Sequence, residues 1–163
     1  MTQALSYPLD EFAYEYNAGP VETAEEIDQG VKAGNCRFGI QLYFYRVHKI
    51  FFKKYDIYLP GGYKVMGEFI FKEEPIDFNI LKVGDVVYAQ NLRDRNGREI
   101  DKSLERYRNR DEWLYYLHSV IYVGKIKGEH YVWHATHIDH GPTLWKLDKF
   151  KYYYHPVSAK RIL

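Results

Sequence analysis

Apolar residues recur at helical spacing in the stretch that follows Asn35. Four of them are spaced three or four residues apart: Ile40, Phe44, Val47 and Phe51. This is the period of an α-helix, and Asn35 is a favoured N-cap. The pattern predicts a mostly buried helix from about residue 36 to residue 54. A shorter helix over about 23–32 is predicted by Thr23 and Glu26, whose spacing fits a capping box.

Strand patterns dominate the second half of the chain. LKVGDVVYA (81–89) has a Gly-Asp turn before an apolar run, and FKYYYH (150–155) is an aromatic run of strand type. HSVIYVGKI (118–126) and HYVWHAT (130–136) are separated by Lys127-Gly128-Glu129, which predicts a hairpin. The second of these strands is predicted to end before Gly141-Pro142. Helices followed by antiparallel strands indicate an α+β fold.

Length and composition indicate one globular domain over residues 1–163. The chain is 46% hydrophobic and 28% charged, with 18% aromatic residues. We interpret residues 1–29 as an N-terminal extension and 92–117 as a charged insertion. A formal net charge of +1 argues against nucleic-acid binding through bulk charge, and acids are mixed among the arginines of the insertion.

The sequence contains no recognisable targeting signal. MTQALSYPLDEF at the start has neither a basic nor an apolar signal-peptide region, and no run reaches 18 apolar residues. We therefore expect a cytoplasmic protein with no membrane partner. The oligomeric state is not predicted by the sequence.

Cys36 is the only cysteine, so it forms neither an internal disulfide nor a cysteine-rich zinc site. A free cysteine is most often a small buried apolar residue. Its predicted place in the first turn of a helix instead favours the thiolate, because unpaired N–H groups and the helix dipole stabilise negative charge. Cys36 is thus a possible nucleophile.

A nucleophilic thiol needs a base, and the base needs an orienting group. His118 opens one strand of the predicted hairpin and His134 lies on the other strand. The hairpin register places His134 near Val120 or Tyr122, which makes the two histidines diagonal neighbours. Each histidine taken alone is more often structural or merely exposed.

Four stretches in this order resemble the NlpC-type family of papain-like cysteine peptidases: GNCRFGIQLYFY, LKVGDVVYA, HSVIYVGKI and VWHAT. The resemblance spans about residues 30–163. It implies a papain-like NlpC-type fold, in which N-terminal helices pack on a central antiparallel sheet. It also implies that Cys36 is the nucleophile, His118 the general base and acid, and His134 the residue that orients His118.

The family implies hydrolysis of an amide bond in a small peptide, such as a peptidoglycan fragment next to a D-glutamyl residue, without a cofactor. Asn35 and Arg37 stand where an acid and a serine are usual, and Ser119-Val120 replaces Val-Gly. Asn35, Arg37 and Ser119 are therefore candidates for the substrate cleft, and Arg37 favours an anionic substrate. The family's upstream tyrosine is missing from VETAEEID, which leaves Tyr14 or Tyr16 as a substitute.

Two other interpretations remain open. A metal site is suggested by a cluster within eleven residues: His130, His134, His137, Asp139 and His140. A catalytically degenerate domain that binds a peptide or a protein partner is suggested by Arg37 and by the missing tyrosine. In that case the arginine-rich segment is a candidate contact surface, although such segments are usually solvated.

Overall fold

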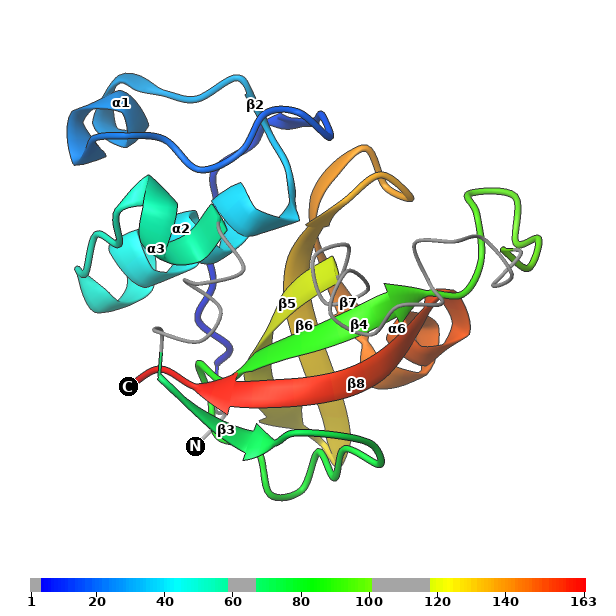
Figure 1. The fold of residues 1–163 in the computed structure, drawn as a ribbon. Coiled ribbons are helices and arrows are strands. Elements are labelled where there is room, and N and C mark those ends of the chain that lie inside the picture. Colours follow the sequence, from blue (N-terminus) through cyan, green and yellow to red (C-terminus); the bar gives the residue numbers. More distant parts are fainter. Residues whose placement is uncertain (1–3, 59–66, 101–117) are drawn as a thin grey trace.

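A six-stranded antiparallel sheet forms the centre of the computed structural model, which describes residues 4–58, 67–100 and 118–163 (Figure 1). Its strand order is β3-β8-β4-β5-β6-β7. The strands are β3 (Glu68–Phe71), β4 (Val86–Asn91), β5 (His118–Ile126), β6 (Glu129–Thr136), β7 (Gly141–Lys146) and β8 (Tyr154–Arg161). Together with the helices, this sheet confirms the α+β class.

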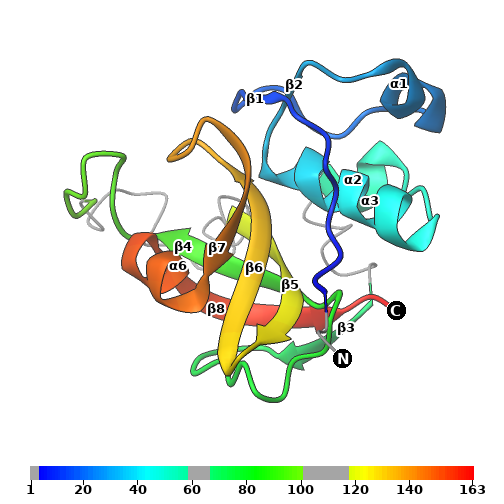
Figure 2. The ribbon, with the colours of Figure 1, turned by 180° about the vertical axis from the view of Figure 1, so that it is seen from behind.

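The helices lie in two places relative to the sheet. Among the described residues, the helices are α1 (Ala24–Gln29), α2 (Cys36–His48), α3 (Lys54–Tyr58) and α6 (Leu147–Tyr153). In Figures 1 and 2 helices α1, α2 and α3 gather at one end of the molecule, and α6 lies beside the sheet near the start of β8. A short parallel pair, β1 (Ala13–Tyr14) with β2 (Ala33–Gly34), precedes α2. No helix among the described residues combines the length and the apolar character needed to span a bilayer.

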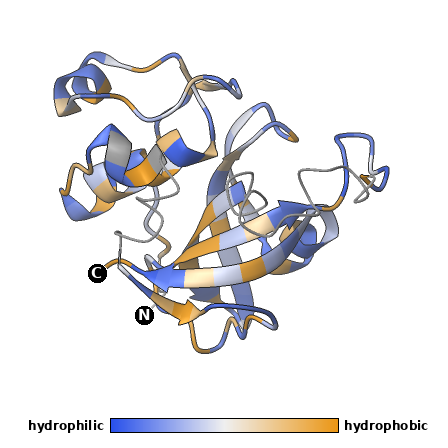
Figure 3. Ribbon diagram, viewed as in Figure 1, coloured by the Kyte–Doolittle hydropathy of each residue, from blue (hydrophilic) through white to orange (hydrophobic). Residues whose placement is uncertain are grey.

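Side chains alternate between the two faces of the sheet, and each face has its own hydrophobic core. Val86 and Tyr88 of β4 join the cluster that contains the buried face of α2, whereas Val87 and Ala89 join the cluster that contains Phe150 of α6. Figure 3 shows the resulting mixture of hydrophobic and hydrophilic positions along the elements. The sheet is thus covered by α2 on one face and by α6 on the other.

The start of α2 is fixed by Asn35, as the sequence predicts. The Asn35 Oδ1 atom accepts hydrogen bonds from the backbone N–H groups of Arg37 (3.1 Å) and Phe38 (3.0 Å). The helix ends at His48, earlier than the predicted residue 54, because Lys49 adopts a left-handed conformation with φ of 61°. The predicted helix is therefore too long, and α3 begins only where that prediction ends, at Lys54.

Gln41 holds the N-terminal segment against α2. Its side chain is fully buried and forms both an accepted hydrogen bond from Val21 N–H (2.7 Å) and a donated one to Val21 O (2.8 Å). The same amide donates to Phe52 O beyond the end of the helix (2.8 Å). One buried amide thereby links three segments, which satisfies backbone groups that have no partner in a helix or sheet.

The predicted hairpin between β5 and β6 is confirmed. Ile126 lies opposite Glu129, so the turn consists of Lys127 and Gly128, both with positive φ. Along the hairpin Ile121 pairs with Trp133. This register places His118 and His134 diagonally across the two strands, as predicted.

Several predicted elements differ from the structure. The run 150–155 is predicted to be a strand, but it is divided between the end of α6 and the start of β8. Its aromatic residues suit both elements, because Phe150 of α6 and Tyr154 of β8 pack in the same core. β6 ends at Thr136, before Gly141-Pro142 as predicted, but these two residues begin a further strand, β7, which was not predicted; Pro142 is tolerated there because β7 is an edge strand. β3 was not predicted. Most of the charged insertion, at 101–117, lies outside the described residues.

A buried carboxylate links the start of β4 to the end of the neighbouring strand, β8. Asp85, 2% exposed, precedes β4 and receives two hydrogen bonds from Arg161 at the end of β8, at 3.0 and 2.8 Å. It also accepts a hydrogen bond from Lys82 N–H (2.7 Å). Removing one partner of such a pair leaves the other uncompensated.

We predict that Arg161→Ala lowers the free energy of unfolding by about 3 kcal/mol, because it leaves the Asp85 carboxylate buried without its cation. Urea denaturation measures this loss. The matched control is Lys146→Ala, which removes an ion pair of two exposed side chains, Lys146 and Glu129 at 3.2 Å, and which should cost much less. Equal losses in the two variants contradict the assignment.

Candidate active site

Cys36 is the first residue of α2 and lies against the start of β5. A backbone hydrogen bond from Ser119 reaches its thiol, and the N–H groups of Cys36 and Arg37 also face the sulfur. Helix α2 packs on β5 and β6, where Gly39 lies against Ala135. The thiol thus lies next to the residue that follows His118.

The environment of the thiol opposes its ionisation. Part of Cys36 is accessible to solvent, yet burial of the thiol raises its pKa. The positive charge of Arg37 and the backbone N–H groups act in the opposite direction, with less effect. The expectation of a thiolate favoured by the helix start is therefore wrong for the resting protein, because desolvation outweighs the helix terminus.

His118 and His134 form a buried pair. His118 Nε2 lies 2.7 Å from His134 Nδ1, and the two residues are 6% and 1% exposed. The ring planes meet at 68°, in an edge-on arrangement. The structure therefore brings together the two histidines that the sequence singled out.

Both imidazoles are neutral in this environment. Burial, followed by the positive charge of His137, lowers the pKa of His118 to about 3. Burial also lowers the pKa of His134, and the neighbouring His118 adds to this effect. No carboxylate among the described residues counts among the causes that act on either ring.

The hydrogen bond between the rings constrains their tautomers, because only one proton lies between the two nitrogens. If His118 Nε2 donates, His118 Nδ1 carries a lone pair and can act as a base. His134 then carries its proton on Nε2, a buried atom with no hydrogen-bond partner among the described residues. The ring of Trp145, centred 4.5 Å from that of His134 in a T-shaped contact, supplies an aromatic neighbour.

Tyr154, at the start of β8, packs against the ring of His118. Its ring stacks on the His118 ring with centroids 4.2 Å apart and an interplanar angle of 12°. The Tyr154 hydroxyl and Thr136 Oγ1 share a hydrogen bond of 2.5 Å, and Thr136 Oγ1 also accepts from Ile138 N–H. Burial raises the pKa of Tyr154, and Cys36 lies close enough to contribute. Tyr154 therefore holds the ring of His118 in one orientation.

Tyr14 approaches the site from the N-terminal segment. It lies opposite Gly34 in the β1–β2 pair, two residues before Cys36. Burial raises the pKa of Tyr14, and the next cause is the charge of an ionised Cys36. The hydroxyl is therefore protonated at neutral pH and close to the thiol, whereas Tyr16 is 68% exposed. Of the two predicted substitutes for the upstream tyrosine, the structure brings Tyr14 to the site.

The three predicted cleft residues have different positions. Asn35 is buried and its side chain caps α2 and donates to Tyr16 O at 3.0 Å, so it holds the helix start rather than lining an open cleft. Ser119 is also buried, and its contribution to the thiol is its backbone. Arg37 is half-buried and acts on Cys36 through its charge.

The histidines proposed for a metal site point to different partners. His134 binds His118, whereas His130 Nδ1 lies 2.8 Å from the Tyr122 hydroxyl and its Nε2 lies 3.2 Å from Asn79. Over the described ranges there is no group of three or more His, Cys, Asp or Glu side chains placed to hold a metal ion. The spacing of the histidines is thus explained by strand β6 and the turn after it.

Comparison of the chain with models of protein families, with curated proteins and with solved structures finds no match. The site is therefore interpreted from its own geometry.

Sequence reasoning missed Tyr154 and Thr136. Tyr154 belongs to the aromatic run whose change from helix to strand has no periodic signal. Thr136 ends the VWHAT stretch and has the same alternation as His134, so its side chain is on the same side of β6. This alternation is the signal that the sequence offers for Thr136, but it indicates a site residue only when Tyr154 is known to lie beside Thr136.

We predict that protonation of the buried pair destabilises the protein in mild acid. The pKa of both rings is lowered from the ordinary 6.5, that of His118 to about 3, so below pH 6.5 the unfolded chain binds more protons than the folded chain. Stability is then complete above pH 6.5 and falls below it by about 1.4 kcal/mol per pH unit for each ring. Urea denaturation between pH 4.5 and 7.5, within about two units of 6.5, measures this slope.

The variant that tests this origin is His118→Gln, which should reduce the slope regardless of its effect on stability at pH 7. The control is His140→Asn, which changes an exposed histidine outside the buried pair whose left-handed backbone suits asparagine; the slope of His118→Gln is compared with the slopes of the wild type and of this variant. An unchanged slope in His118→Gln contradicts the assignment.

Proposed function

We propose that this chain is a cysteine peptidase or amidase with a papain-like, NlpC-type fold, which hydrolyses an amide bond of a small peptide. Two observations carry the proposal: the buried hydrogen bond between His118 and His134, and the hydrogen bond from the backbone of Ser119, the residue after His118, to the Cys36 thiol. A nucleophile, a base and a group that orients the base are the minimum set for thiol acyl transfer.

The chemistry follows from the tautomer in which His118 Nε2 donates to His134. His118 Nδ1 then accepts the thiol proton as Cys36 Sγ attacks the carbonyl carbon of the amide. The tetrahedral intermediate collapses when the same proton passes to the leaving amine, and a thioester remains on Cys36. A water molecule, deprotonated by His118, hydrolyses the thioester and restores the thiol.

Donors for the oxyanion are available next to the sulfur. The backbone N–H groups at the start of α2 face the thiol, and the protonated hydroxyl of Tyr14 lies near it. Fixed donors aimed at developing negative charge lower the barrier of acyl transfer. We propose that Tyr14 fulfils the function of the family's upstream tyrosine.

Burial gives this site a neutral resting state. It raises the pKa of Cys36 and lowers the pKa of His118 to about 3, so a thiolate–imidazolium pair is not favoured before substrate binds. The proton therefore moves during attack rather than in advance. This differs from a preformed ion pair and makes the orientation of His118 by His134 and Tyr154 more important.

The substrate class rests on the family resemblance and on Arg37. Its positive charge lies beside the nucleophile, where it favours a substrate with a carboxylate near the scissile bond. Amide bonds next to D-glutamyl residues in peptidoglycan fragments have such a carboxylate. We propose this class of peptide as the substrate.

We predict that Cys36 in the folded protein reacts with iodoacetamide at pH 7 and that His118→Ala slows this reaction about tenfold or more, because the base is lost. Mass spectrometry of the digested protein locates the adduct and measures its rate. The matched control is His130→Ala, which removes a histidine of the same strand pair that is hydrogen-bonded to Tyr122. Equal rates in both variants, or an unreactive Cys36, reject His118 as the base.

A second candidate function is a peptide-binding domain without catalysis. The observation in its favour is the opposing pair of shifts, a raised thiol pKa and a lowered imidazole pKa, which an inert buried cluster would also have. Catalysis and binding differ in the effect of removing the sulfur.

We predict that the wild-type chain hydrolyses a peptide with a D-glutamyl amide bond and that Cys36→Ala abolishes turnover while it still binds the peptide. Chromatographic detection of the released amine and calorimetric titration of Cys36→Ala with intact peptide make this comparison. If the wild type binds the peptide with the same affinity as Cys36→Ala and releases no product, the binding domain is the better description.

A further inference from the structure

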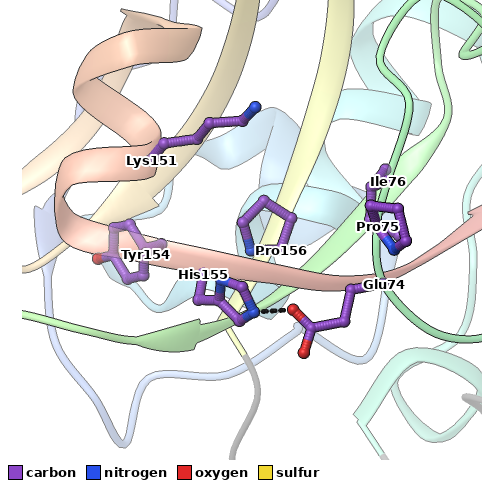
Figure 4. A pocket seen from close by; sticks show the side chains of 7 residues that line it. All are labelled: Glu74, Pro75, Ile76, Lys151, Tyr154, His155 and Pro156. Atoms are coloured by element: carbon purple, nitrogen blue, oxygen red, sulfur yellow. Dashed lines mark hydrogen bonds and ion pairs between the residues drawn. The ribbon is translucent and has the colours of Figure 1, made fainter.

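A cavity of about 470 Å³ lies between the end of α6, the start of β8 and the loop that follows β3. Figure 4 shows Lys151 extending from α6 above Pro156, with Glu74, Pro75 and Ile76 on the other side. The remaining lining residues are Tyr154 and His155. Its volume is in the range of sites that hold small organic ligands.

The walls of the cavity are apolar over most of their area. Pro75, Ile76 and Pro156 contribute rigid or branched hydrocarbon surface, and neither proline has an N–H group to be satisfied. Because Pro156 belongs to β8 and is paired opposite Ala89 of β4, this wall is part of the sheet. A rigid apolar wall favours a ligand with a compact apolar body.

The acidic and the basic side chain that line the cavity are Glu74 and Lys151. Glu74 is already engaged by His155 Nε2, as the dashed line in Figure 4 shows. Lys151 forms no ion pair with the described residues, and its ammonium group lies 5.6 Å from the centroid of the Phe78 ring. The pair Glu74–His155 therefore closes one side, while Lys151 offers positive charge at the cavity.

We propose that this cavity is a binding site for a small organic carboxylate with an apolar body. The carboxylate pairs with Lys151, and the apolar part lies against Pro75, Ile76 and Pro156. Binding at this cavity does not depend on the chemistry of Cys36, so this proposal is tested separately from the proposed hydrolase activity.

The cavity also has a structural link to the candidate active site. Tyr154 lines the cavity, and its ring stacks on His118. The two sites thus share one residue but have different polar groups, because Cys36 and His134 do not line the cavity.

The test uses phenylbutyrate as the probe, with phenylbutanol as the neutral ligand of nearly the same shape. Titration of the ¹⁵N-labelled full chain, followed by amide chemical shifts, measures affinity and location together. We expect saturable amide shifts centred on Glu74, Ile76 and residues 151–155, and binding of phenylbutanol about fivefold weaker, because a charge-assisted contact is lost.

Lys151→Met keeps the length of the side chain and removes its charge, and it should weaken phenylbutyrate about fivefold. The matched control is Lys149→Met on the same helix, whose ammonium lies over the Trp145 ring outside the cavity and which should change affinity less than twofold. Absence of saturable shifts at these residues, equal affinity for the alcohol, or equal effects of the two lysine variants would each overturn the proposal.

Discussion

The candidate site depends on the close approach of the α2 N-terminus to the first residues of β5. Gly39 of the helix faces Ala135 of β6, and the Asn35 cap fixes where the helix begins. These contacts bring the Cys36 thiol to the backbone N–H of Ser119, next to His118. A helix that began one residue later would rotate the cysteine by about 100° and away from the strand.

The second constraint is the depth of the site. Desolvation acts on the thiol and on both imidazoles in the direction of the neutral form, and no carboxylate among the described residues offsets it. Orientation therefore has to come from packing and from one hydrogen bond. The stacked Tyr154 ring and the bond to His134 supply this orientation, and Tyr154 is itself held by Thr136. In the proposed reaction, proton transfer is therefore coupled to attack, and no reactive thiolate is stored beforehand.

The parts predicted well from sequence are those with a local signal. The capping box at Thr23 and Glu26, the Asn35 cap and the Lys127-Gly128 turn each specify their own backbone, and the hairpin then determines that His118 and His134 meet. The diagonal placement of the histidines follows from strand register alone.

The remaining parts depend on contacts between distant segments. The end of α2 at Lys49 and the change from α6 to β8 have no periodic signal, because aromatic residues suit either a helix or a strand that packs on the sheet. The pKa of Cys36 was misjudged for a similar reason. The helix terminus can be identified in sequence, whereas the desolvation that outweighs it is a property of the assembled core.

The most direct measurement of the central claim is the identification of an acyl-enzyme. The protein is mixed with p-nitrophenyl acetate, quenched in acid and analysed by intact mass and by peptide mapping. The account predicts one acetyl group, attached to Cys36, that forms in the wild type and is lost with time, and that forms much more slowly in His118→Ala. Absence of an acetyl group on Cys36, or equal acetylation of the wild type and His118→Ala, would contradict the account.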